Sequence, residues 1–341
     1  VSASMPTKKP EADESARVEK AAGERRKSGF MSGAAGRNIG LVVALLLLCA
    51  VGFATAGERF ASVSNLMTIL SLGSVTGVLA IGMTFVITTG GIDLSVGSVL
   101  GLSSVWATTL ATQSYGWVVM VFCALAVGLG AGLLNGLIIA YGRVVAFIAT
   151  LAMLVAARGL AELIAQKRTQ IVQVDAFNDI FRGNLLGVPK IVWIFAVVAV
   201  LGWFLFNRTT FGRRTVAVGG NAEAARLAGI KVKRHLLYVY ALSGLTAGIA
   251  GVMILARTSA GSSTNGLLLE LDTIAAVVVG GTLLAGGRGT IVGTVLGVLI
   301  FTTLTNVFII NNIDSSVQQI AKGAIIVGAV LLQQRLSRRT T

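Results

Sequence analysis

Two long intervals without a charged residue constrain the fold of this chain more than any other feature. No Asp, Glu, Lys or Arg occurs between Asp93 and Arg143, or between Lys190 and Arg208. Because a membrane-spanning helix needs roughly 20 apolar residues, the first interval holds two spans and the second holds one short span. Only 12% of all residues are charged. The chain is therefore expected to be an all-α polytopic membrane protein.

Apolar segments elsewhere extend this pattern to an expected count of ten transmembrane helices. Segment 271–285 is short and ends in the glycine-rich run LLAGGRGT, so a full span and a broken or re-entrant helix both stay open. The ten segments are 39–56, 66–89, 96–112, 117–141, 145–165, 190–206, 236–257, 271–285, 290–310 and 317–334.

The distribution of basic residues predicts the topology. An even number of spans places both termini on one side, and the loops of that side together carry 20 of the 28 Lys and Arg residues. Basic loops face the cytoplasm, so both termini and the loop 207–235 are expected there. The net charge of +14 therefore reflects topology and not binding to nucleic acid. The expected organisation is a disordered cytoplasmic tail (1–37), a transmembrane domain (38–335) and a short cytoplasmic tail (336–341).

A sequence repeat relates two glycine-rich segments. GGIDLSVGSVLGL at 90–102 aligns without gaps to GGRGTIVGTVLGV at 286–298, with seven identities in thirteen positions. Such repeats mark duplicated halves in transporters, often at interrupted helices near the substrate path. Similar composition is the alternative explanation. The span count makes the two copies parallel, whereas an inverted duplication needs one loop on the other face.

Few polar side chains fall within the expected spans, and these are candidates for a translocation pathway. Buried ionisable groups in membranes usually face a cavity or a partner. Asp93 either lines a polar pathway at a broken helix or caps the helix that follows it. Arg158 and Glu162 are four residues apart and are expected to pair with each other. The pathway candidates are Thr88, Thr89, Asp93, Ser95, Asn135 and Asn306, although the two asparagines suit interhelical hydrogen bonds equally well.

The sequence contains none of the common catalytic or cofactor motifs. It has no HExxH, no Ser-His-Asp arrangement and no GxxxxGK[ST] loop. Cys49 and Cys123 both fall in expected spans, which argues against a disulfide framework or a zinc site. The chain is therefore expected to be no enzyme, to hold no metal or cofactor and to hydrolyse no ATP by itself.

The basic loop NRTTFGRRTVAVGGNAEAARLAGIKVKRH at 207–235 contains a short helix with both ends marked. Asn221 is a capping residue, Glu223 lies where the helix dipole favours an anion, and Gly229 ends the helix. So short a helix is unstable alone in water, so it must dock on something. A contact for a soluble partner is the favoured interpretation, and an ordinary positively charged loop is the alternative.

Several motifs, taken in order, resemble the ribose-type permeases of bacterial sugar ABC importers. They span roughly residues 60–335 and are GGIDLSVGS (90–98), RTTFGRRTVAVGGNAEAARLAGI (208–230), YALSGLTAGIAG (240–251), ELDTIAAVVVGGT (270–282), GGRGTIVGT (286–294) and QQIAKG (318–323). The resemblance implies a fold similar to that of the vitamin B12 importer, in the bacterial cytoplasmic (inner) membrane. The stretch RVVAFIATLA at 143–152 departs from the family, because relatives commonly carry prolines there.

The same resemblance implies the partners and the coupling residues. The partners are a second permease chain, a cytoplasmic subunit that binds ATP and Mg, and an extracytoplasmic sugar-binding protein. The expected cargo is a monosaccharide, pentose or hexose. A nucleoside, polyol or signalling sugar is the alternative, and an autonomous secondary transporter is less favoured. The residues matching the family's coupling segment are Gly219, Gly220, Asn221, Glu223, Ala224, Ala225, Arg226, Leu227 and Gly229.

Overall fold

The structure is a computed structural model that describes residues 34–338, so most of the expected N-terminal tail and residues 339–341 lie outside it. Helices dominate, as expected. The helices are α2 (Ala34–Ala56), α3 (Glu58–Ala61), α4 (Val63–Thr88), α5 (Val96–Ala107), α6 (Leu110–Gln113), α7 (Trp117–Ala140), α8 (Ala146–Ala165), α9 (Asp175–Phe181), α10 (Lys190–Arg208), α11 (Thr210–Gly220), α12 (Ala222–Leu227), α13 (Val232–Thr258), α14 (Leu269–Val279), α15 (Ile291–Ile310) and α16 (Ser315–Arg338). The strands are β1 (Gln170–Ile171), β2 (Asn184–Leu185), β3 (Val188–Pro189) and β4 (Ala260–Gly261).

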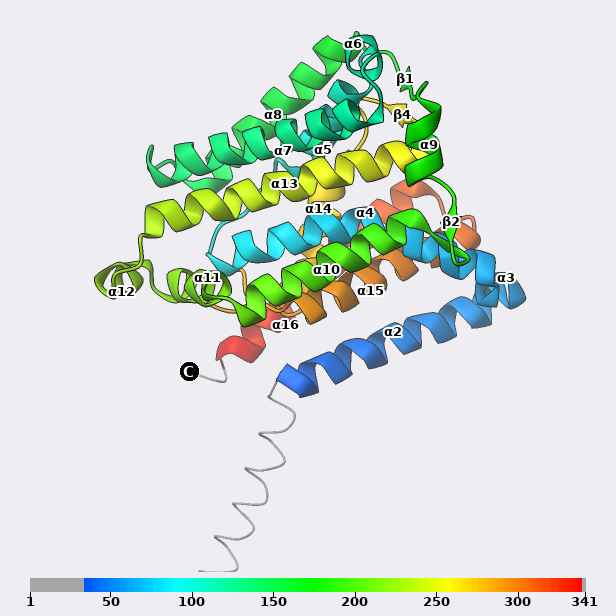
Figure 1. Cartoon of the computed structure of the whole chain (residues 1–341). Coiled ribbons are helices and arrows are strands. Elements are labelled where there is room, and N and C mark those ends of the chain that lie inside the picture. The colour runs from blue at the N-terminus through cyan, green and yellow to red at the C-terminus, as the bar shows by residue number, and fades with distance from the viewer. Residues whose placement is uncertain (1–33, 339–341) are drawn as a thin grey trace, which may run out of the picture.

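Seven helices in the described part of the chain are long and apolar enough to cross a membrane. They lie side by side in one bundle (Figure 1). Most residues of helices α4 and α13 are buried and form its centre, whereas few residues of α2 and α10 are buried. An apolar helix with an exposed surface is stable where lipid covers it. The structure therefore agrees with a polytopic membrane protein.

The other three expected spans are not among the helices that are long and apolar enough to cross a membrane. Segment 96–112 forms the 12-residue helix α5 and then turns at Thr108 into α6. Segment 271–285 forms the 11-residue helix α14 and continues as irregular chain up to Thr290. At about 1.5 Å per residue both helices are well short of the ~30 Å hydrocarbon layer. Segment 317–334 lies within α16, which is not among the seven.

Small residues allow the central helices to approach closely. A Cβ atom on Gly128 of α7 would lie 2.6 Å from the Gly248 nitrogen of α13. One turn further along, a Cβ on Gly132 would lie 2.9 Å from the Gly244 Cα. Without a strong hydrophobic effect in lipid, such close backbone packing is a main source of helix association. This contact places α13 against α7 along most of their length.

The two ends of the bundle differ (Figure 1). Helices α11 and α12 lie at one end, called the α12 end below, and the start of α2 lies toward it. At the opposite end β1 pairs with β4, and β2 pairs with β3 in a tight hairpin. The charges of Arg158 and Glu162 attract each other, as expected, but the two side chains do not form a direct ion-pair contact. The Arg158 guanidinium instead donates to the carbonyl oxygens of Ser263 and Asn265, because the loop before α14 folds over α5 and offers these acceptors.

Candidate coupling and translocation site

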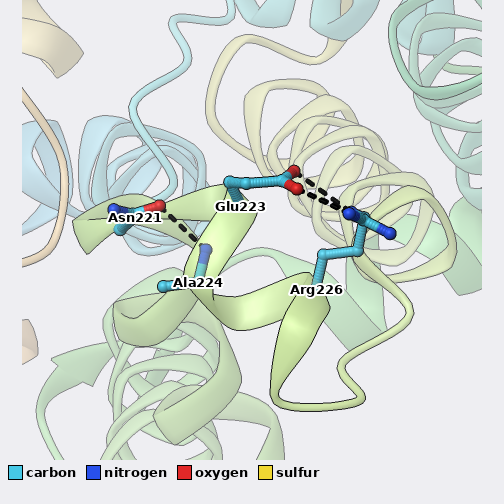
Figure 2. A network of polar contacts seen from close by, with 4 residues as sticks. All are labelled: Asn221, Glu223, Ala224 and Arg226. Atoms are coloured by element: carbon cyan, nitrogen blue, oxygen red, sulfur yellow. Dashed lines mark hydrogen bonds and ion pairs between the residues drawn. The ribbon is translucent and has the colours of Figure 1, made fainter.

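Helix α12 forms where the sequence predicts it, and with the predicted ends. The Asn221 side-chain oxygen accepts a hydrogen bond of 2.9 Å from the Ala224 N–H (Figure 2). This bond satisfies one of the free donors of the first turn. After the last turn Gly229 adopts φ +85°, a left-handed conformation that favours glycine. The Gly229 N–H donates to the Arg226 carbonyl at 3.0 Å and closes the helix.

The outer face of α12 is charged and exposed. The Arg226 guanidinium donates to the Glu223 carboxylate at 2.5 Å, with both side chains open to solvent (Figure 2). The hydrogen bond and the positive charge of Arg226 hold the pKa of Glu223 below its ordinary value. Leu227 is 75% exposed, whereas Ala225 is buried against the bundle. An exposed apolar side chain therefore directly follows the exposed ion pair along α12.

Glycines anchor this segment to the bundle. The Gly287 N–H donates to the Thr88 carbonyl at 2.9 Å. Gly219, near the end of α11, packs directly on that bond: a Cβ there would overlap the Thr88 oxygen and lie 2.6 Å from the Gly287 nitrogen. A Cβ on Gly286 would likewise lie 2.9 Å from the Gly90 nitrogen. We call this contact of Gly219, Gly286 and Gly287 with Thr88 and Gly90 the glycine junction.

The glycine junction joins the coupling segment to both copies of the sequence repeat. One copy begins at the break between α4 and α5, and the other at the break between α14 and α15. Both copies run from this junction toward the opposite end of the bundle. The end of α5 lies beside β1, where the Thr108 hydroxyl donates to the Gln170 side chain, and the end of α15 lies beside the start of α4. The copies are therefore parallel, as the span count predicts. Thr84 and Thr294 also share a hydrogen bond of 2.8 Å between their hydroxyl groups. The sequence offered only one signal of this contact, namely the glycine pairs at 90–91, 219–220 and 286–287.

A buried polar cluster follows the first break. One Asp93 oxygen accepts from the Ser95 N–H at 3.0 Å and from the Ser95 hydroxyl at 2.6 Å. The other accepts from the Ser243 hydroxyl of α13 at 2.8 Å. The Asn135 amide of α7 donates to the Ser95 hydroxyl at 3.0 Å. The structure thus brings Asp93, Ser95 and Asn135 together, and it adds Ser243, which sequence reasoning missed.

Two polar atoms near this cluster have no hydrogen-bond partner within the described residues. They are the Asn135 side-chain oxygen and the Tyr240 hydroxyl, and both are buried. The Tyr240 hydroxyl lies beside Gly91, where a Cβ would be 3.4 Å from its ring carbon Cζ. An unpaired buried polar atom costs about 1–3 kcal/mol. The Asn135 oxygen and the Tyr240 hydroxyl therefore each keep unused hydrogen-bonding capacity.

The remaining pathway candidates lie apart from Asp93. The Thr88 and Thr89 hydroxyls donate to carbonyls of their own helix, those of Thr84 and Val86. Asn306 exchanges two hydrogen bonds, of 2.7 and 3.1 Å, with Asn65 at the other end of α4. That reciprocal pair fastens α15 to α4.

A small cavity of about 130 Å³, with both apolar and polar lining residues, lies beside the middle of α4. Its walls come from α4, α13, α14 and α15. They include Arg257, Asp272, Thr302 and Thr305, none of which stood out in the sequence. Asp272 also accepts from Lys322 of α16 at 2.8 Å. This ion pair fastens α16 to α14 beside the cavity.

Comparison with known proteins identifies the family. Residues 65–332 match the family described as "Branched-chain amino acid transport system / permease component". The chain is 42% identical to the ribose import permease protein RbsC of Escherichia coli K12 over 298 residues, 86% of this chain and 92% of that protein. It is 40% identical to RbsC of Bacillus subtilis, covering 80% and 85% of the two chains.

Relatives with other names match over a similar length. The L-arabinose ABC transporter permease protein AraH of Azospirillum brasilense is 37% identical over 86% of this chain and 87% of its own. The galactose/methyl galactoside import permease protein MglC of Escherichia coli K12 is 37% identical over 86% and 93%. No solved structure matches the chain. The resemblance to ribose-type permeases is thus confirmed, and the chain belongs to this family of transport-system permease components.

Proposed function

We propose that this chain is the membrane permease subunit of an ABC importer for a monosaccharide. The observation that carries the proposal is the glycine junction, in which the end of α11, directly before the exposed helix α12, contacts both helix breaks. A device that converts motion of a soluble subunit into motion of membrane helices needs such a connection. The names of the relatives, which include ribose, L-arabinose and galactose permeases, support a pentose or hexose as cargo.

The partners follow from this role. Helix α12 faces the cytoplasm of a bacterium, with the protein in its inner membrane and both termini cytoplasmic. A separate subunit docks on α12, binds ATP and Mg and hydrolyses the nucleotide. A second permease chain completes the pathway, and an extracytoplasmic binding protein delivers the sugar at the opposite end of the bundle. The basic residues on α11 and around α12 support this orientation.

The proposal includes the number and arrangement of the membrane segments. The seven long helices, together with α5, α14 and α16, make up ten membrane segments in an arrangement similar to that of the vitamin B12 importer. Segments α5 and α14 cross only part of the layer and end in irregular chain inside the bundle. Irregular backbone at membrane depth is tolerated where protein or a polar cavity surrounds it.

The translocation pathway runs past the polar cluster in this proposal. Asp93, Ser95 and Asn135 supply hydrogen bonds, Thr88 and Thr89 lie at the adjoining helix end, and Asn306 belongs to the opposite end. The unpaired oxygens of Asn135 and Tyr240 support this assignment, because sugar hydroxyls can both donate and accept. The cavity beside Arg257 and Asp272 offers further partners of the same kind.

Uptake measured in a strain deleted for its own sugar importers tests the function. Cells receive this chain with its cognate ATP-binding subunit and binding protein, and are given labelled ribose, arabinose, galactose, a nucleoside and a polyol. We expect accumulation of a pentose or hexose that disappears when the ATP-binding subunit is omitted. Accumulation without that subunit would indicate a secondary transporter, and uptake of the nucleoside or polyol alone would refute the monosaccharide assignment.

Changing Asp93 to Asn tests the polar cluster. The variant keeps the size of the side chain but replaces the carboxylate, whose oxygens accept three hydrogen bonds, with an amide. We expect folding stability to fall by about 1–3 kcal/mol and uptake to fall about tenfold or more at an unchanged amount of membrane protein. The matched control is Glu162→Gln, the same change at an exposed site. Normal uptake by the Asp93 variant would leave the cluster with a structural role only.

A further inference from the structure

A second concave site lies beside the coupling segment and belongs neither to the glycine junction nor to the polar cluster. It is a cavity of about 440 Å³ between α11 and the first turns of α13. Its walls include three cationic side chains, Arg214, Lys231 and Arg234, and three with large apolar surfaces, Phe211, Ile230 and Tyr238. We call it the basic pocket.

The positive charge of the basic pocket is not balanced within the described part of the chain. No acidic residue lines it, and the ion pairs found among the described side chains join Arg226 to Glu223 and Lys322 to Asp272. The N-terminus of α13 adds to this charge. Lys231 occupies the N-cap position there, and no side chain caps the helix. A free helix N-terminus attracts anions through its N–H groups and its dipole.

The floor of the basic pocket is held in place. The His235 ring is buried and shares a hydrogen bond of 3.0 Å with the Thr215 hydroxyl of α11. The same ring packs on Phe211 with 4.7 Å between centroids. These contacts fix α11 to α13 beneath the three cations. The charges therefore converge on one volume, which distinguishes them from the basic residues scattered along an ordinary loop.

We infer that the basic pocket binds a phosphate-bearing anion, and that its occupant is the headgroup of an anionic phospholipid. Basic pockets between membrane helices are suited to such headgroups. The apolar side chains favour a lipid over free phosphate, because only a lipid brings glycerol and acyl carbons to cover Phe211, Ile230 and the half-exposed Tyr238.

The surrounding aromatic residues support a lipid occupant rather than an acidic protein. Lys233 lies over the ring of Tyr141 at 5.8 Å, and Arg208 lies over the ring of Trp203 at 5.4 Å. Trp and Tyr at the ends of apolar helices mark the level of lipid headgroups. Tyr141, Trp203 and Tyr238 all occur at the ends of α7, α10 and α13 that lie toward α12 (Figure 1). A lipid in the pocket bridges α11 and α13 at that level.

Native mass spectrometry of the purified full-length chain, after exchange into mixed phosphatidylglycerol and phosphatidylcholine micelles, tests this inference. The test variant changes Arg214, Lys231 and Arg234 to Gln. The matched control changes Arg208, Arg213 and Lys233 to Gln, which removes the same charge from the same segment but outside the pocket. We expect the wild-type and control chains to retain phosphatidylglycerol about tenfold more than phosphatidylcholine. The test variant is expected to lose that preference.

Four results would overturn the inference. Equal loss of preference in both variants would mean a diffuse effect of charge, and full retention by the test variant would mean that no site exists there. Displacement of the lipid by millimolar inorganic phosphate, with no cost to stability, would identify a soluble anion as the occupant. If the test variant keeps its lipid but loses the ATP-binding subunit in co-purification, the pocket is a protein contact. If the triple variant does not fold, the single variant Arg214→Gln replaces it. We expect this single variant to lose part of the preference for phosphatidylglycerol.

Discussion

Replacing Gly219 with Ala is expected to abolish uptake and to reduce the yield of folded protein. The new methyl group would overlap the Thr88 carbonyl oxygen and press on the Gly287 nitrogen at 2.6 Å. Both are backbone atoms joined by a hydrogen bond, so no side-chain rotation relieves the contact. Overpacking of this kind costs about 1–3 kcal/mol, and occasionally more. We place this substitution at the upper end of that range.

Gly220→Ala is the matched control for this experiment. A Cβ on Gly220 meets nothing within 4 Å. Alanine is also the better helix former, by about 1 kcal/mol in a helix interior. Thermal stability of the purified chain and sugar uptake in cells are the measurements, and we expect the Gly220 variant to match the wild type in both. If Gly219→Ala matches it too, the glycine junction transmits nothing that transport requires.

Features of this chain that depend on nearby residues could be predicted from the sequence, whereas contacts between distant segments could not. The ends of α12 depend on Asn221 and Gly229, which act within a few residues of themselves, and both were predicted from the sequence. The glycine junction joins residues near 88, 219 and 287, and such a contact depends on how the bundle packs. Glycine pairs show where backbones can approach closely, but they do not show which other backbone approaches.

Polar residues in the spans illustrate the same limit. The spacing of Arg158 and Glu162 favours a pair on one helix, yet the carbonyls of the loop at 263–265 accept from Arg158 instead. The sequence left two roles open for Asn306 and indicated no role for Asn65. Their hydrogen bonds join two helices that are far apart in the sequence, so neither residue could be assigned to the other. Ser243 lies within the motif YALSGLTAGIAG, but nothing in that motif indicated that its hydroxyl would reach Asp93 beyond the end of α4.

The structure also changes how coupling is understood for this chain. A docking helix alone could move without affecting the spans. Here the end of α11 contacts the end of α4 and the loop before α15 at once. In the proposed function, a displacement of α12 reaches both copies of the sequence repeat through these backbone contacts, because closely packed atoms transmit strain.

Replacing Glu223 with Lys is expected to abolish uptake and co-purification of the ATP-binding subunit, while membrane insertion stays normal. The new lysine lies beside Arg226 in place of the ion pair and opposes the dipole at the start of α12. Because Arg226 holds the pKa of Glu223 below its ordinary value, the wild-type pair persists at neutral pH. It is lost only when acid protonates the carboxylate.

A charge-swapped variant separates helix stability from recognition by the partner. Glu223→Lys combined with Arg226→Glu restores an ion pair at the same spacing, although it now opposes the helix dipole. If the pair only stabilises α12, uptake should largely recover in the double variant. If the ATP-binding subunit contacts each charge separately, uptake should stay about tenfold or more below wild type. We expect this second result, because both side chains are exposed and can contact a partner. Wild-type uptake and wild-type recovery of the subunit with Glu223→Lys alone would show that α12 is not the coupling element.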